Sequence, residues 1–140
     1  MKIRQQRGVT LIELLITVIV VAILAGVALP GYRQYVIRAQ RADAKTQLQQ
    51  LAAALERCFT RFNAYNHADC AAQTSLPRLI GGGRYQLQAR ALTAANFTIA
   101  AVPQGAQTDD TECRTLTLTS ANVRGVTDGA TRTAAYCWEH

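Results

Sequence analysis

Two groups of residues in this 140-residue sequence have the types and the spacing to do chemistry. The first is a lone acid, Glu13, which begins a long apolar run with no further charge before Arg33. Inside a membrane a carboxylate is destabilised by about 2.5–3.5 kcal/mol or more, so an acid there needs a cationic partner. The second is a set of four cysteines beyond that run, which favours disulfide chemistry in an oxidising compartment.

The cysteines form no Cys-x-x-Cys pattern, and their four positions leave three pairings open. Cys58 and Cys70 enclose a short loop, and so do Cys113 and Cys137 near the end of the sequence. We therefore favour the pairing Cys58–Cys70 and Cys113–Cys137. Two such bonds would each stabilise the fold by about 2–4 kcal/mol, mainly by restricting the unfolded chain.

Metal binding is the alternative use of some of these residues. His67 and Asp69 lie close to Cys70 and, with Cys58, offer zinc ligands, but their spacing matches no common four-ligand zinc pattern. A second cluster is acidic and consists of Asp109, Asp110 and Glu112. Its spacing is not that of an EF-hand calcium loop. We therefore expect a solvated turn there, and neither a metal nor a cofactor in the chain.

Catalytic motifs are also absent from the sequence. It contains neither the Gly-x-Ser-x-Gly pattern of a serine nucleophile nor the His-Glu-x-x-His pattern of a zinc protease. The glycine run 81–83 lacks the Lys-Ser/Thr that a phosphate-binding loop requires, and is expected to form a flexible turn into a strand. We therefore expect that the protein is not an enzyme.

The apolar run has the length of a membrane span. Residues 14–32 carry no charge, and at 1.5 Å per residue this helix would reach about 28 Å, close to the hydrocarbon thickness of a bilayer. Three basic residues precede the run: Lys2, Arg4 and Arg7. Basic residues beside a span mark its cytoplasmic end, so the net charge of +6 is partly a topology signal. Net charge is therefore weak evidence for nucleic-acid binding.

A helical pattern continues beyond the apolar run. Pro30 should kink or loosen the helix without ending it, because apolar residues recur at every third or fourth position from Ala44 to Phe62. This pattern predicts one helix from about Val9 to Phe62, with a single apolar stripe in its second half. Polar side chains such as Arg41 are expected on its other faces.

Alternating residues downstream predict a small sheet. The expected strands are 84–92, 96–102 and 114–119, with a short edge strand within 123–126. In the first strand one face is expected to hold Tyr85, Leu87, Ala89 and Ala91. The segment Cys137-Trp138 is expected to tie the end of the chain back to the sheet. The fold class is therefore α+β, with a long N-terminal helix packed on a small antiparallel sheet.

The segment Gly8-Val9-Thr10-Leu11-Ile12-Glu13, followed by the apolar run, resembles the prepilin leader and stem of type IV pilins, closest to the type IVa class. The residues from Asn96 to Trp138 resemble pilins of the minor type. The resemblance implies a structural filament subunit of three parts. These parts are a leader (1–8), a transmembrane and assembly stem (9–30) and a periplasmic, then extracellular, globular head (31–140).

Roles of single residues follow from the same resemblance. Prepilin peptidase would cut after Gly8 and would N-methylate the new N-terminus, Val9. Glu13 would pair with the N-terminal amine of a neighbouring stem during assembly, and Pro30 matches the family's helix-loosening position. One departure is that the family usually has Phe after the cut, which leaves the extent of Val9 methylation open.

The implied partners are prepilin peptidase, other pilin subunits through stem-to-stem packing, and the inner membrane with its pilus assembly machinery. The subunit would span the inner membrane once before joining a surface pilus for adhesion, twitching motility or DNA uptake. DNA is therefore a further candidate partner. Its binding face would use arginines of the head, namely Arg78, Arg84, Arg90, Arg114, Arg124 and Arg132. Ordinary solvated surface charge is the simpler interpretation of these arginines.

Three alternatives to a pilus subunit remain open at this point. Within the family, the chain could be a pseudopilin of type II secretion. Outside it, the chain could be a membrane-tethered binding domain, although no residue set predicts a ligand pocket. The N-terminus could also be a secretory signal peptide cut after Ala28. Glu13 at the start of the apolar run and the helical pattern beyond Pro30 argue against that last alternative.

Overall fold

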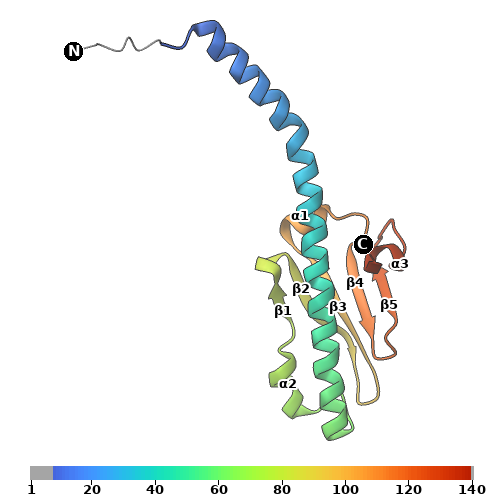
Figure 1. The fold of residues 1–140 in the computed structure, drawn as a ribbon. Coiled ribbons are helices and arrows are strands. Elements are labelled where there is room, and N and C mark those ends of the chain that lie inside the picture. Colours follow the sequence, from blue (N-terminus) through green and yellow to red (C-terminus); the bar gives the residue numbers. More distant parts are fainter. Residues whose placement is uncertain (1–7, 140) are drawn as a thin grey trace, which may run out of the picture. The chain divides into compact units, whose positions relative to one another are not determined.

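The computed structural model describes residues 8–139, without the side chains of Pro30 and of residues 71–73. The predicted leader, apart from Gly8, therefore lies outside the described residues. The helices are α1 (Leu11–Phe62), α2 (Ala68–Thr74) and α3 (Ala134–Glu139), with short 3-10 turns η1 (Gly81–Gly83) and η2 (Gly105–Asp109). The strands are β1 (Arg78–Ile80), β2 (Tyr85–Leu92), β3 (Phe97–Pro103), β4 (Thr115–Thr119) and β5 (Arg124–Thr127). Figure 1 shows this arrangement.

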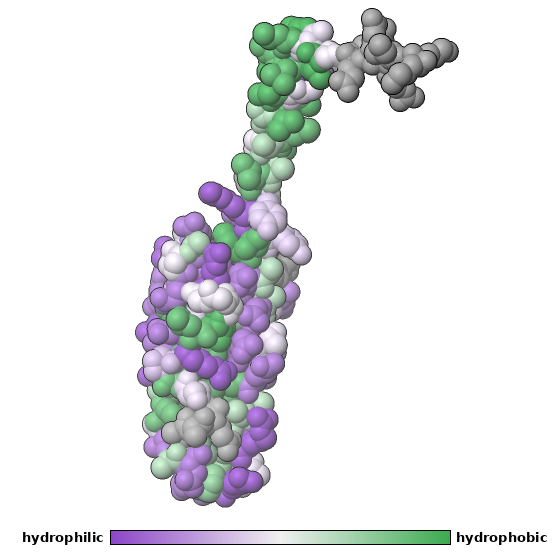
Figure 2. All heavy atoms as spheres, turned by 90° about the vertical axis from the view of Figure 1, so that its left-hand side faces the viewer, coloured by the Kyte–Doolittle hydropathy of each residue, from purple (hydrophilic) through white to green (hydrophobic). Residues whose placement is uncertain are grey.

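The chain divides into two compact units, one ending at Val36 and the other beginning at Ile37. In the first unit, which contains the predicted stem 9–30, α1 begins at Leu11 after Thr10, whose hydroxyl accepts the N–H of Glu13 at 3.3 Å. This contact caps the helix, because a threonine oxygen satisfies one of the unpaired amides of the first turn. The side chains from Leu11 to Leu29 are exposed around the whole helix, and Figure 2 shows this part as a mostly green column. By length and composition this is the one described helix that could cross a membrane.

The second unit, which makes up most of the predicted head 31–140, is a helix packed on a sheet. All five strands pair antiparallel in the order β1-β2-β3-β4-β5, and the head part of α1 crosses one face of this sheet (Figure 1). The core joins the apolar stripe of α1 to the inward residues of the strands. Its main members are Ala44, Leu48, Leu51, Leu55, Tyr85, Leu87, Phe97, Ile99, Leu116 and Leu118. The predicted α+β fold is therefore confirmed.

The predicted helix and four strands agree closely with the structure, but one predicted face is wrong in part. Tyr85, Leu87 and Ala89 share one face as expected, with Ala89 opposite the buried Ile99, although the Ala89 side chain itself is exposed. Ala91 leaves this face, because it pairs with Thr98 and Leu92 takes the inward position opposite Phe97. The pairing of β2 with β3 shifts between Ala89 and Ala91, which places a β-bulge at Arg90. A bulge inserts an extra residue and so interrupts the two-residue alternation on which the prediction depended.

Three elements have no counterpart in the sequence prediction: α2, β1 and α3. Each is seven residues or shorter, too short to show a helical or alternating period. The glycine run is also better defined than expected. It forms η1 between β1 and β2, and all three of its glycines have positive φ, from 57° to 83°. Side chains disfavour this backbone region, so the turn requires glycine.

Candidate functional site

The predicted processing and assembly residues lie at the start of the stem. Gly8 and Val9 precede the first helical turn, both are exposed, and a Cβ added at Gly8 would meet nothing within 4 Å. The peptide bond between them is therefore sterically open to an enzyme. Glu13 follows in the first turn of α1, and it makes no salt bridge with any residue in the described range. Its carboxylate is thus available to a cation from another molecule.

Pro30 lies inside α1, which continues as a helix on both sides of it. A proline cannot donate the backbone hydrogen bond that the helix would otherwise form at that position. Its expected role in loosening the helix remains a prediction.

The head contains both disulfide bonds in the predicted pairing. Cys58–Cys70 joins α1 to α2 with a Cα–Cα distance of 6.0 Å, and Cys113–Cys137 joins the segment before β4 to α3 at 5.6 Å. The expected tie of the chain end to the sheet is also present. The indole N–H of Trp138 donates to the carbonyl oxygen of Gly125 in β5 at 3.1 Å. Among the described residues, no group of three or more His, Cys, Asp or Glu side chains is placed to hold a metal ion.

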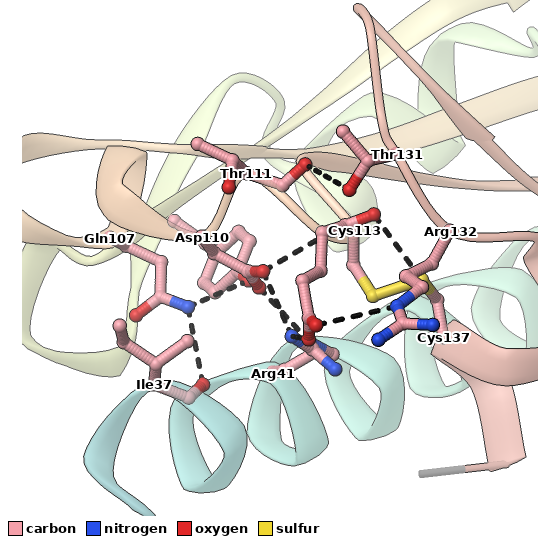
Figure 3. Close-up of polar contacts among 11 residues, drawn as sticks. Ile37, Arg41, Gln107, Asp110, Thr111, Cys113, Thr131, Arg132 and Cys137 are labelled. Carbon is pink, nitrogen blue, oxygen red and sulfur yellow. Dashed lines mark hydrogen bonds and ion pairs between the residues drawn. A yellow bond between two sulfur atoms is a disulfide. The ribbon is translucent and has the colours of Figure 1, made fainter. Parts of the chain in front are cut away.

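A buried ion pair in the head was not predicted. Arg41 of α1 and Asp110, directly after η2, have side chains only 1% exposed. The guanidinium donates from Nε to Asp110 Oδ2 at 3.0 Å and from its terminal Nη2 to Oδ1 at 2.8 Å (Figure 3). The expected exposed position of Arg41 and the expected solvated turn at Asp110 are therefore wrong, although Asp109 next to it is exposed. The reason is that each charge satisfies the other across 69 residues of sequence.

The pair belongs to a buried polar cluster that fixes η2 against α1. The amide of Gln107 donates to the carbonyl oxygen of Ile37 at 3.2 Å and to the hydroxyl of Tyr85 at 3.0 Å. The N–H of Cys113 donates to Asp110 at 3.2 Å, which connects the cluster to the second disulfide. Burial raises the pKa of Tyr85 to about 12, and the Asp110 carboxylate adds to this shift. The cluster is neither open nor free to react, so its role is structural.

The six arginines of the predicted DNA face differ in their contacts within the head and in their exposure. Arg90 pairs with Asp128 at 3.1 Å, and Arg132 pairs with Glu112 at 3.4 Å. Arg124 lies 5.4 Å from the centre of the Trp138 ring, and Arg114 is only partly exposed. The remaining two, Arg78 and Arg84, are also partly buried. Three of the six, Arg90, Arg124 and Arg132, therefore already contact another side chain of the head.

Comparison with known proteins gives matches to both parts of the chain. Residues 3–29 match the family described as prokaryotic N-terminal methylation motif. Among curated proteins, the type IV major fimbrial protein FimA of Dichelobacter nodosus is 42% identical over 53 residues, which are 38% of this chain and 34% of FimA. The type IV major pilin PilE1 of Neisseria gonorrhoeae is 56% identical over 39 residues, 28% of this chain and 24% of PilE1. The chain thus matches about a third or less of the length of these relatives.

The fold has a solved counterpart. The crystal structure of the non-core minor pilin PilV of Neisseria meningitidis superposes with a TM-score of 0.54 at 17% identity, covering 71% of this chain and 94% of PilV. Residues 30–117 match the family described as type IV minor pilin ComP, DNA uptake sequence receptor. Since this match covers more than half of the chain, the resemblance to type IV pilins is confirmed, and the chain belongs to that minor pilin family.

Proposed function

We propose that the protein is a minor subunit of a type IV pilus, held in the inner membrane by its stem and then assembled into the filament. The observation that carries this proposal is the arrangement at the N-terminus. An open Gly8–Val9 bond is followed by an apolar helix that could cross a membrane, and the single acid in its first turn forms no salt bridge with another described residue. The methylation motif covers this same segment.

The geometry supports the following order of events. Prepilin peptidase cuts after Gly8, which removes the basic leader 1–8 and exposes the amine of Val9 for N-methylation. The stem 9–30 keeps the subunit in the membrane while the head 31–140 faces the periplasm. The Val9 amine of one subunit then neutralises Glu13 of the next. Because this contact is head-to-tail, its repetition builds an open helical filament. A type II secretion pseudopilus would use the same steps, and copy number in sheared surface pili separates the two.

The processing step is tested on the protein isolated from cells. Its N-terminal sequence is expected to begin at Val9, with an intact mass that includes one methyl group, and sheared pili are expected to contain a few copies per filament. A mature chain that begins at Leu29 would instead identify a cleaved signal peptide and a secreted protein. A subunit that forms the bulk of the filament would contradict the minor role.

DNA binding by the head is a second proposed function. The observation that favours it is the match of residues 30–117 to a family described as a DNA uptake sequence receptor. The arginines of the head supply the positive charge that phosphate contacts need. The full-length mature chain in detergent micelles is expected to shift DNA in a gel at low salt. Its affinity for DNA is expected to fall steeply as the salt concentration rises. The absence of any shift at low salt would eliminate this function.

A further inference from the structure

The end of α1 borders a hollow of about 690 Å³ that the sequence analysis did not anticipate. Its walls are the last two turns of α1 and the Cys58–Cys70 disulfide, which holds α2 beside them. The side chains of Glu56, Arg57, Arg61 and Phe62 also line it. All of these belong to the head.

The charge in this hollow is net positive, because two arginines and one acid line it. Arg57 and Arg61 are exposed and lie one helical turn apart on the same side of α1. Neither forms a salt bridge with any residue that the structure describes. The one acid of the hollow, Glu56, already accepts the hydroxyl proton of Tyr65, at 3.0 and 3.1 Å from its two oxygens. The two guanidinium groups are therefore available to external anions.

A stacked pair of rings, Phe62 and His67, lies beside these arginines. The rings of Phe62 and His67 are parallel within 1°, with centroids 4.1 Å apart. Both are partly exposed, and Phe62 lines the hollow. The guanidinium carbon of Arg61 lies 6.0 Å from the centre of the Phe62 ring. His67 covers one face of Phe62, and the flexible Arg61 side chain extends over the ring, so a planar group that enters from the hollow would meet the Phe62 ring beside the Arg61 guanidinium.

We propose that this hollow binds single-stranded DNA, with successive phosphates on Arg57 and Arg61 and an unpaired base stacked on Phe62. The inference rests on the proposed DNA binding and gives it a location away from Arg90, Arg124 and Arg132, which are engaged within the head. Cations beside a partly exposed aromatic ring are the combination by which proteins hold single strands. A duplex suits the hollow less well, because its bases are already stacked and paired and cannot reach the ring.

The test uses the full-length mature chain in detergent micelles and fluorescence anisotropy with a labelled oligo-dT of about 12 nucleotides. The Phe62→Leu variant is expected to weaken binding by about 5- to 150-fold without changing its salt dependence. The Arg57→Gln/Arg61→Gln variant is expected to lower the slope of log affinity against log salt by about 1.4, since each phosphate contact on a single strand contributes about 0.7. Phe62→Trp keeps an aromatic face and is expected to retain binding.

Controls separate this site from general charge and from misfolding. Arg38→Gln removes an exposed arginine from the same helix, far from the hollow, and is expected to leave the slope unchanged. Fluorescence of the buried Trp138 reports whether each variant without an added tryptophan is folded, and circular dichroism serves for Phe62→Trp. Unchanged oligo-dT binding in Phe62→Leu and in the arginine variant would overturn this location while leaving DNA binding intact. Equal weakening of a duplex of the same length by Phe62→Leu would overturn the stacking. If the unmodified chain binds no DNA, the proposed DNA function fails as well.

Discussion

The Asp110→Ala variant is expected to lose about 3–5 kcal/mol of head stability, because it leaves the Arg41 guanidinium buried without its counter-charge. Both side chains are 1% exposed, so water cannot replace the missing carboxylate without opening the head. Glu112 compensates little, since its carboxylate lies 3.8 Å from Arg41 and is 39% exposed. Thermal unfolding of the full-length chain in detergent, followed by Trp138 fluorescence, measures the loss as a lower melting temperature.

The neighbouring residue provides a matched control. Asp109→Ala removes the same group one position away, but this side chain is exposed and is not part of the ion pair. It is expected to change stability by less than about 0.5 kcal/mol. The double variant Arg41→Met/Asp110→Leu should recover much of the loss, because an apolar pair has no unpaired charge. A loss in Asp110→Ala no larger than that in Asp109→Ala would show that the buried pair does not stabilise the head.

Most of the fold could be predicted because its elements are long and periodic. The stripe from Ala44 to Leu55 repeats with the helical period, and it is this stripe that packs on the sheet. In β3 and β4 the large apolar residues alternate along the sequence, and Ile99 and Leu118 are inward partners in the observed register. The missed elements are short and depend on contacts made elsewhere in the chain. For example, α3 is held by the Cys113–Cys137 disulfide and by the Trp138 hydrogen bond to β5.

The polar interior of the head could not be predicted from local sequence. Arg41 has the pattern of a surface residue because the nearest acid in sequence, Asp43, is two positions away and therefore faces another side of the helix. Its partner Asp110 is 69 residues away and lies beside Asp109, which is exposed. Two adjacent aspartates with opposite environments give no periodic signal. The free arginines at the end of α1 were missed for a similar reason, because only the structure shows the disulfide closing a hollow around them.

The N-terminal motif could be located from the sequence, unlike the polar interior, because its residues lie close together in the chain. Gly8, Val9 and Glu13 need no tertiary contact within the chain to be placed, because they lie just before and within the first turn of one helix. Sequence alone therefore locates them. Their function depends on a second subunit, and it is tested only in the assembled filament.

Replacing Glu13 by alanine is expected to reduce the amount of this subunit in sheared pili by about 100-fold. An unpaired carboxylate in the membrane is destabilised by about 2.5–3.5 kcal/mol. In the proposed assembly the amine of a neighbouring Val9 pairs with the Glu13 carboxylate and removes this penalty. Relief of that penalty favours the assembled over the free subunit, and each 1.4 kcal/mol corresponds to a factor of ten. In Glu13→Ala the free subunit carries no such penalty, so this preference for the filament disappears. Quantitative immunoblots of membrane and sheared-pilus fractions measure the change.

The level in the membrane fraction should stay normal or rise, because alanine makes the stem more apolar without altering the site of cleavage. Thr17→Ala is the matched control, since it removes a polar side chain one turn further along the same exposed helix. The Thr17 hydroxyl donates to the carbonyl oxygen of Leu14 at 2.7 Å and carries no charge for a neighbour to neutralise. Thr17→Ala is therefore expected to enter filaments at the normal level. Glu13→Ala at that same level would mean that Glu13 does not drive assembly, and the ion pair between stems would have to be abandoned.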